Sequence, residues 1–319
     1  MLVLMARGNL TKFTAFSNED EAIAMLESIR WPNGVACPHC GGADPYRLTA
    51  KPGTKTRVQK GLWKCSQCRK KFTVKVGTVF EQSHIPVSKW LMAIHLLSAS
   101  KKGMSAHQFH RMLGMTYRSA WFMAHRLRHA MASNELLSKL TGVIEADETY
   151  VGARYKRGGK QGRPGVDSHK VPVFALVQRG GQVRTFPINR VTAANIRQAL
   201  QTHVDPAATL VTDEFPSYIK PGREFARHLT VNHQAGVYVR GDATTNTVEG
   251  FFALLKRGIM GTFHHLSKGH LHRYCSEFEF RYNNRIALGV DDETRAKNLV
   301  VAAEGKRLTF KQPSSTSAA

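Results

Sequence analysis

Three acidic residues in the C-terminal half of the chain stand where carboxylates could cooperate. Asp147 lies within the segment IEADETYV, Asp213 lies at the end of TLVTDE, and Glu249 lies in NTVEGFFALLK. Cleavage of a phosphodiester with two metal ions requires several carboxylates that converge from separate elements. Carboxylate oxygens are hard ligands that suit Mg²⁺ or Mn²⁺. The three acids therefore predict a magnesium or manganese site that acts on phosphodiesters.

The order of the elements around these acids supports this interpretation. The sequence predicts a strand with Asp147, a hairpin, a helix, a strand that ends at Asp213 and a later helix with Glu249, which is the RNase H-like layout. Thirty-five residues separate Asp213 from Glu249, the spacing for which DD35E recombinases are named. Lys256 follows Glu249 by two helical turns. Both lie on one helix face, so Lys256 could contact DNA phosphates beside the metals.

Each aspartate has an acidic neighbour, Glu148 beside Asp147 and Glu214 beside Asp213. Successive side chains of a strand point to opposite faces, so only one acid of each pair can face the metals. An isolated aspartate is usually a turn or cap residue. The layout of all three acids is what favours the catalytic interpretation.

Four of the five cysteines form two C-x2-C pairs with 24 residues between them: Cys37, Cys40, Cys65 and Cys68. Each pair supplies two thiolates from one turn, and together they complete the tetrahedral set that a structural zinc ion needs. His39 could compete as a ligand, although a residue inside such a pair usually points outward. The basic residues 69–71 after the second pair suit a surface that faces a polyanion. Cys275 is expected to be an ordinary buried thiol.

The helices and strands that must position these residues divide the chain into five segments. We expect an N-terminal helix in 1–30, a zinc ribbon in 31–80, a helix-turn-helix in 85–135, an α/β catalytic domain in 140–305 and a disordered tail in 306–319. In the first segment, Ser17 or Asn18 could cap a helix that Pro32 ends.

The segments MSAHQFHRML and YRSAWFMAHRLRHAM read as two helices joined by a short turn around Gly114. This pattern fits a helix-turn-helix that binds DNA, and it also fits a helical hairpin that merely packs. The basic residues of the second helix favour DNA binding: Arg118, His125, Arg126 and Arg128.

The catalytic segment is expected to contain a strand in TGVIEADETYVG, a hairpin that turns at Gly180-Gly181, and a helix capped by Thr192. Two late helices are expected in TTNTVEGFFALLKRGIM and LSKGHLHRYCSEFEFRYNNR. In the first of them, Phe251, Phe252, Leu254 and Leu255 are expected to be core rather than a wedge into DNA. A basic loop at 152–170 could close over DNA with four residues: Lys156, Arg157, Lys160 and Arg163. His264 and His265 could contact phosphate, but exposed loop histidines are common.

A net charge of +23 costs self-repulsion unless a polyanion neutralises it. Nucleic acid is the expected partner, and counterion release would supply sequence-independent affinity. A membrane surface or an acidic protein remains an alternative. The chain has no apolar run of the length that crosses a membrane, and its apolar N-terminus is too short for a signal peptide. We therefore expect a cytoplasmic protein.

Several stretches resemble bacterial insertion-sequence transposases of the ISXO type, which are relatives of the Merlin elements and carry an N-terminal zinc ribbon. The stretches are IEADETYVG, LVTDEFPSY, VNHQAGVYV, TNTVEGFFALLKRGIMGTFHHLS and FRYNNR. The resemblance implies a DDE-type transposase that acts on the terminal inverted repeats of its own element in a bacterial nucleoid. It also implies that Asp147, Asp213 and Glu249 are the metal-binding triad.

The third catalytic position has a second candidate. Relatives are often described with Asn at this position, and Asn246 lies one turn before Glu249 on the same helix face. Asn can bind a metal through its carbonyl oxygen but cannot act as a base. Charge favours Glu249, with Asn246 as an adjacent ligand or DNA contact.

The predicted function is metal-dependent cleavage of double-stranded DNA at the element's ends, followed by attack of the freed 3′-hydroxyl on target DNA. Joining two ends in concert requires a homodimer or larger assembly. Two other functions remain open: a regulator with an inactive RNase H-like scaffold, and a structure-specific nuclease that cuts but does not join.

Overall fold

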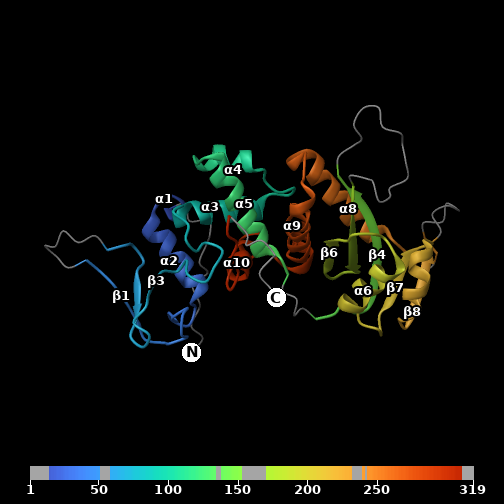
Figure 1. Cartoon of the computed structure of the whole chain (residues 1–319), viewed down its shortest axis with the longest axis horizontal. Coiled ribbons are helices and arrows are strands. Elements are labelled where there is room, and N and C mark those ends of the chain that lie inside the picture. The colour runs from blue at the N-terminus through green and yellow to red at the C-terminus, as the bar shows by residue number, and fades with distance from the viewer. Residues whose placement is uncertain are drawn as a thin grey trace, which may run out of the picture. The chain divides into compact units, whose positions relative to one another are not determined.

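The computed structural model describes residues 14–50, 58–133, 138–152, 170–231, 239–240 and 243–310. The chain forms two compact units, unit 1 from 1–131 with 290–319, and unit 2 from 132–289 (Figure 1). Among the helices described, none has the length and apolar character that crossing a membrane requires.

The ribbon segment of unit 1 forms a small antiparallel sheet, as expected from its short β-like runs. Its strands, in sheet order, are β1 (Pro45–Arg47), β2 (Trp63–Cys65) and β3 (Lys71–Phe72). Phe72 is buried in one cluster with Cys37 and Cys65. The small core of the ribbon is therefore built around its cysteines.

Beyond the ribbon, the regular elements of unit 1 that the structure describes are helices: α1 (Thr14–Ser17), α2 (Glu19–Arg30), α3 (Val87–Ala99), α4 (Ala106–Leu113), α5 (Tyr117–Met131) and α10 (Asp292–Ala302). Asn18 caps α2 by accepting a hydrogen bond from the backbone N–H of Asp20 at 3.0 Å. Helix α10 packs on α2 and α3. Helix α10 thus belongs to unit 1, and unit 2 ends at 289.

Helices α4 and α5 form where the sequence predicts them. Ser105 and Gln108 make a capping box at the start of α4, and Gly114 ends it with φ +56°. The predicted DNA-contacting role of three α5 residues is wrong, because they are buried: His125 (1% exposed), Arg126 (8%) and Arg128 (2%). Their basic character suggested DNA contact, but most of α5 is buried, including the side that carries these residues.

The buried Arg126 forms a hydrogen bond with the first part of the expected tail. Arg126 Nε donates to the carbonyl of Leu308 at 3.2 Å, and Nη1 donates to Val79 at 3.0 Å. Leu308 itself is buried. Residues 306–310 are therefore ordered, contrary to expectation, while 311–319 lie outside the described residues.

Unit 2 is built on a five-stranded mixed sheet in the order β6-β5-β4-β7-β8. The strands are β4 (Val143–Val151), β5 (Val171–Gln178), β6 (Val183–Pro187), β7 (Thr209–Asp213) and β8 (Arg227–Val231). The first three strands are antiparallel, and β7 and β8 run parallel to β4. The expected hairpin turns between β5 and β6, where Gly180 adopts φ +69°.

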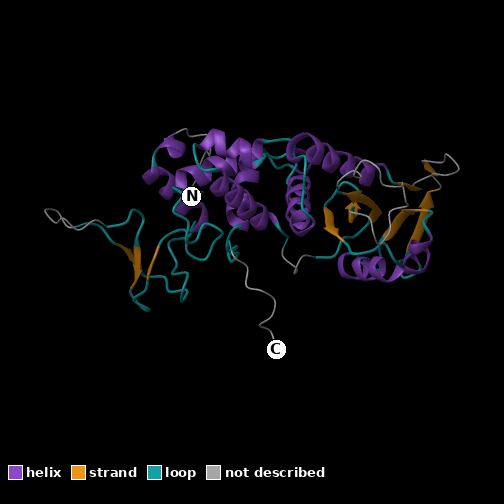
Figure 2. Ribbon diagram, turned by 45° about the horizontal axis from the view of Figure 1, so that its top comes forward, coloured by secondary structure: helices purple, strands orange, loops and turns teal. Residues whose placement is uncertain are grey.

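Helices cover both faces of this sheet (Figure 2). Even-numbered residues of β4 and β5, such as Ile144 and Phe174, pack with α6 (Ala193–His203). Odd-numbered residues of β5, such as Val173, pack with α8 (Asn246–Gly258) and α9 (Leu271–Asn283). The alternation follows from the two-residue period of a strand.

Short elements complete the described part of unit 2: 3-10 turns at Pro216–Tyr218, Lys268–His270 and Ile286–Leu288, α7 (Ile219–Gly222), a π-helical turn at Ile259–Phe263, and the pair β9 (Val239–Arg240) and β10 (Ala243–Thr244). The order of strand, hairpin, helix, strand and later helix that the sequence predicts for the acids is confirmed.

Candidate functional site

Asp147 and Asp213 lie at the same level on neighbouring parallel strands. In the register of β4 and β7, Glu145 is opposite Val211. Two residues further along each strand come Asp147 and Asp213. Since side chains repeat every two residues, both aspartates lie on the same face of the sheet as Glu145 and Val211. The fold thus brings together two acids that are distant in the sequence.

Glu148 is directed away from Asp147. Its carboxylate accepts a hydrogen bond from the hydroxyl of Tyr218, which is fully buried in the core beneath α6. Asp147 accepts the backbone N–H of Glu148 at 2.8 Å. Asp147 and Glu148 thus point to opposite faces of the sheet, as successive residues of a strand do, and the acid on the α8 face is Asp147.

Glu249 lies on the exposed face of α8, in its first turn. Its carboxylate accepts a hydrogen bond from Thr245 Oγ1 at 2.9 Å, and its backbone N–H donates to the Thr245 carbonyl at 3.0 Å. Thr245 is 1% exposed, so a buried hydroxyl holds an exposed carboxylate.

The acids interact electrostatically. Burial, followed by repulsion from Glu148, Asp213 and Glu249, raises the pKa of Asp147 to about 7. A carboxyl that gains a proton so readily is one that a cation would stabilise in its charged form. The oxygen-only donor set of Asp147, Asp213 and Glu249 fits Mg²⁺ or Mn²⁺ in its chemistry.

The carboxylates of these acids do not form a tight cluster. In the part of the chain that the structure describes, three or more such ligand atoms approach within 4.8 Å of one another only at the four cysteines. A site for two ions about 3.5–4 Å apart spans more than this. Asp147, Asp213 and Glu249 therefore do not form a compact set of ligand atoms in the structure.

Asn246 and Lys256 are both exposed on α8 together with Glu249. The backbone N–H of Asn246 donates to Thr244 Oγ1 at 3.2 Å. The expected core character of the same helix is confirmed, because Phe251, Phe252 and Leu255 are buried while Leu254 is partly buried. The polar face of α8 thus carries every α8 residue that the sequence assigned to the site.

Two further candidates on the following turn are exposed, His264 and His265. His264 adopts φ +59°, a backbone conformation that residues other than glycine rarely take. The four basic loop residues Lys156, Arg157, Lys160 and Arg163 lie outside the described residues.

Sequence reasoning missed Glu145 and Thr245. Glu145 is fully buried on the same strand face as Asp147 and accepts hydrogen bonds from the start of α8. The sequence did hold a signal for Glu145: it lies two residues before Asp147, on the same face of the predicted strand. A carboxylate buried there needs a partner, because an unpaired charge in the core is costly. Nothing in the sequence indicated the bond from Thr245 to Glu249.

The four predicted zinc ligands converge in unit 1. The Sγ atoms of Cys37 and Cys68 lie 3.7 Å apart, and those of Cys40 and Cys65 lie 3.6 Å apart. A tetrahedral zinc with bonds of about 2.3 Å sets sulfur atoms about 3.8 Å apart. The cysteines thus form a closed site for structural zinc, and the exposed His39 is not among its ligands.

The two cysteine pairs have matching backbone geometry. Cys37 N–H donates to Gly42 at 2.9 Å, and Cys65 N–H donates to Lys70 at 3.1 Å, five residues on in each case. The residues that follow the second cysteine of each pair, Gly41 and Arg69, have φ of +75° and +60°. A hydrogen bond from the backbone N–H of Cys68 lowers the pKa of the Cys65 thiol to about 7, which favours the thiolate that zinc binds.

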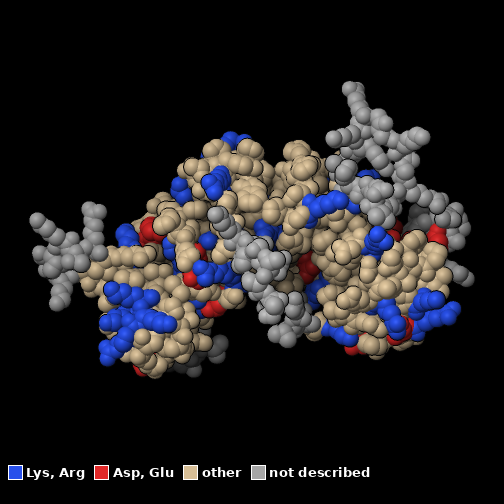
Figure 3. Space-filling view, in the orientation of Figure 1, with Lys and Arg blue, Asp and Glu red and all other residues tan. Residues whose placement is uncertain are grey.

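The surface around the second pair is basic. Arg69, Lys70 and Lys71 are all exposed. Lys and Arg side chains gather over the ribbon in the space-filling view (Figure 3). Arg69 occupies a position with positive φ, which glycine would adopt more easily.

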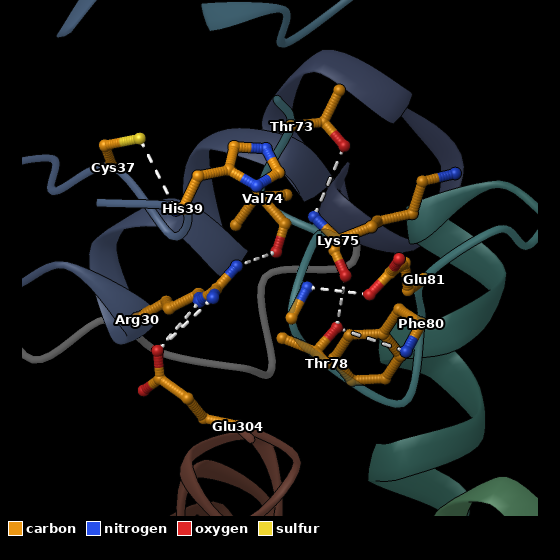
Figure 4. A network of polar contacts seen from close by, with 11 residues as sticks. Arg30, Cys37, His39, Thr73, Val74, Lys75, Thr78, Phe80, Glu81 and Glu304 are labelled. Atoms are coloured by element: carbon orange, nitrogen blue, oxygen red, sulfur yellow. Dashed lines mark hydrogen bonds and ion pairs between the residues drawn. The ribbon is translucent and has the colours of Figure 1, made fainter. Parts of the chain in front are cut away.

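A network of polar contacts joins the ribbon to the helices of unit 1 (Figure 4). Arg30, at the end of α2, donates to the carbonyl of Val74 at 2.7 Å and to Glu304 Oε1 at 3.3 Å. Within the ribbon, the N–H of His39 donates to Cys37 Sγ at 3.4 Å. Arg30 therefore ties α2, the segment after β3 and the end of α10 together.

The lone Cys275 is fully buried in the core between the sheet and α9, as expected. Burial raises the pKa of its thiol to about 12. This thiol is therefore a packing residue.

Comparisons with known proteins match both parts of the chain. Residues 139–283 match the family described as the ISXO2-like transposase domain, and residues 17–71 match the transposase zinc-ribbon domain. A protein in the transposable element ISH50 of Halobacterium salinarum is 30% identical over 280 residues, which cover 83% of this chain and 91% of that protein.

Solved structures with some likeness include the Mos1 strand transfer complex, with 12% identity, a TM-score of 0.27, and coverage of 68% of this chain and 78% of that one. The Mos1 mariner paired-end complex with Mn has 13% identity, a TM-score of 0.25, and coverage of 67% and 78%. TM-scores this low do not establish a shared fold.

Proposed function

The chain belongs to the family of ISXO2-like transposases, and from this membership we propose that it binds the terminal inverted repeats of its own element, cleaves DNA there and joins the ends to target DNA. The proposal is carried by the register of β4 and β7, in which Asp147 and Asp213 fall side by side on neighbouring parallel strands, together with Glu249 in the first turn of α8, a helix that packs on β4. The strand order and the position of the acids support an RNase H-like catalytic unit.

Asp147, Asp213 and Glu249 would hold Mg²⁺ or Mn²⁺. Such ions, when bound, activate an attacking hydroxyl and stabilise charge on the leaving oxygen. Thr245 orients Glu249, and Asn246 on the same helix face is an adjacent ligand or DNA contact. Lys256 would contact a DNA phosphate next to the acids, since it is exposed two turns further along α8.

Unit 1 supplies the features expected of a DNA-binding part. Residues 82–134, which include α3, α4 and α5, contain no Asp or Glu. Exposed cations lie near the turn between α4 and α5, at Arg111 and Arg118. Together with the basic ribbon surface, this region would hold the end of the element through phosphate contacts.

Two more features belong to this proposal. The protein acts in the cytoplasm, on DNA, and it acts as a dimer or larger assembly because two ends must be joined in concert. Both rest on the proposed reaction.

An assay for joined products separates transposition from a nuclease and from an inactive regulator. The protein is incubated with Mg²⁺ or Mn²⁺ and a DNA fragment that contains one end of the element, together with target DNA. A nick that leaves a 3′-hydroxyl at the end, followed by joined products, supports the proposal. Nicks without joining indicate a nuclease, and DNA binding without any nick indicates a regulator.

A further inference from the structure

Glu145 is a buried carboxylate with an unusual set of partners. It is fully buried on β4, yet it is surrounded by donors from two other elements. Its Oε2 accepts the backbone N–H groups of Thr247 at 2.8 Å and Val248 at 3.0 Å. Its Oε1 accepts Thr247 Oγ1 at 2.9 Å. A strand carboxylate therefore caps the N-terminus of α8.

Arg179, from the turn between β5 and β6, completes this arrangement. Its Nε donates to Glu145 Oε1 at 2.7 Å, and its Nη2 donates to the carbonyl of Thr244 at 2.8 Å. Arg179 thus neutralises the buried charge and holds the residue that leads into α8. The favourable helix dipole adds to the same attraction.

The N–H groups of the first turn of α8 are consequently satisfied by side chains. Asn246 donates to Thr244 Oγ1, while Thr247 and Val248 donate to Glu145. Thr245, at the N-cap position, makes no side-chain cap. Its hydroxyl donates to Glu249 instead, because Glu145 supplies the acceptor that a capping residue would normally supply.

From this geometry we infer that Glu145 is a positioning residue, which fixes the third acid of the site, Glu249, relative to the first, Asp147. Glu145 and Asp147 share one strand face, two residues apart, and Glu145 holds the helix that carries Glu249. The inference rests on the proposed function only in that these acids hold Mg²⁺ or Mn²⁺. That Glu145 holds the start of α8 follows from its hydrogen bonds alone.

The test uses the full chain with its zinc retained, and the variants Glu145→Gln and Glu277→Gln. A glutamine can present only one oxygen, so it cannot accept from both the two backbone N–H groups and Arg179. Glu277 is the matched control, because it is equally buried and is paired with Arg281 at 2.9 Å, but on α9. The probe is Mn²⁺ alone, titrated by electron paramagnetic resonance.

We expect Glu145→Gln to weaken Mn²⁺ binding by about 10- to 100-fold, as loss of residues that orient metal ligands does. Amide hydrogen exchange at Thr247 and Val248 should accelerate in this variant, because their acceptor is weakened. Glu277→Gln should leave both readouts at the wild-type value, even if its melting temperature falls. Mn²⁺ affinity and exchange equal to wild type in Glu145→Gln would overturn the inference.

A milder variant keeps the inference testable if Glu145→Gln does not fold. Thr247→Val removes only the hydroxyl bond to Glu145 and keeps the shape of the side chain. It should weaken Mn²⁺ binding by about 3- to 10-fold, and unchanged affinity contradicts the inference. Failure of the proposed function would give a different result. Wild-type protein and Asp147→Asn would then show the same Mn²⁺ binding, or none.

Discussion

The hydroxyl of Thr245 donates to Glu249 Oε1 at 2.9 Å, so a residue that is 1% exposed sets the orientation of a carboxylate at the surface. We predict that Thr245→Val, which keeps the shape and removes the donor, lowers the rate of end cleavage by about 10- to 100-fold, because a hydrogen bond to a charged group is lost. DNA affinity should stay at the wild-type level. Thr245→Ser restores the hydroxyl and should recover the rate. Equal rates for the valine variant and the wild type would show that the contact has no role.

The raised pKa of Asp147 predicts a specific pH dependence of stability. Its pKa rises from 3.8 to about 7 in the folded chain, mainly through burial. Between these values the folded state binds the proton and the unfolded state does not, so the stability that this group contributes falls as pH rises from about 4 through 7. Asp147→Asn should therefore raise the melting temperature at pH 8, without Mg²⁺ or Mn²⁺, by more than at pH 5. A melting temperature lowered equally at both pH values contradicts this.

Bound Mg²⁺ or Mn²⁺ should offset the loss of stability that accompanies ionisation of Asp147 at higher pH. Mn²⁺ competes with the proton for Asp147, so its apparent affinity should increase as pH rises through about 7. Titrations at pH 6 and pH 8 measure this directly, and identical affinities would argue against Asp147 as a ligand.

We predict one zinc ion per chain, bound at the four cysteines of the ribbon. We expect one zinc per chain by metal analysis, and its loss in Cys65→Ser, because Cys65 is a buried member of the four-cysteine site. Cys275→Ser is the control, since it replaces a cysteine that is equally buried outside the site. A folded wild-type protein with less than half an equivalent of zinc would contradict the assignment.

Two arginines of α5 should behave in opposite ways. Arg126 donates to carbonyls of Val79, Glu81 and Leu308, so Arg126→Gln should lower the free energy of unfolding by about 2–4 kcal/mol. Arg118 is exposed, and Arg118→Gln should weaken DNA binding and reduce the slope of log affinity against log salt by about 1. Salt-dependent binding isotherms and thermal unfolding of both variants check this. Loss of DNA affinity in folded Arg126→Gln without loss of stability would reverse the assignment.

The sequence predicted those parts of the site that depend on local pattern. Asp147 and Asp213 were singled out because acids within or at the end of predicted strands are visible in the sequence, and the cysteine pairs because their spacing matches zinc ligands. Strand and helix periods also gave the core of α8, including Phe251 and Leu255.

What the sequence could not predict depends on contacts between distant segments. Glu145 and Val248 are more than a hundred residues apart, and only the folded chain brings them within 3.0 Å. Arg126 was assigned to DNA contact because it is basic and charged residues usually lie at the surface, whereas its acceptors come from segments far away in the sequence.

The most direct test of the central claim is single-turnover cleavage of a DNA fragment that carries one end of the element. Wild-type protein is compared with Asp213→Asn, at concentrations that give equal DNA occupancy in a gel-shift assay. Cleavage should depend on Mg²⁺ or Mn²⁺ in the wild type and should fall below detection in Asp213→Asn, while both proteins bind the DNA equally. Cleavage by Asp213→Asn at the wild-type rate would contradict the proposed active site, and a wild type that binds but never cleaves would contradict the proposed function.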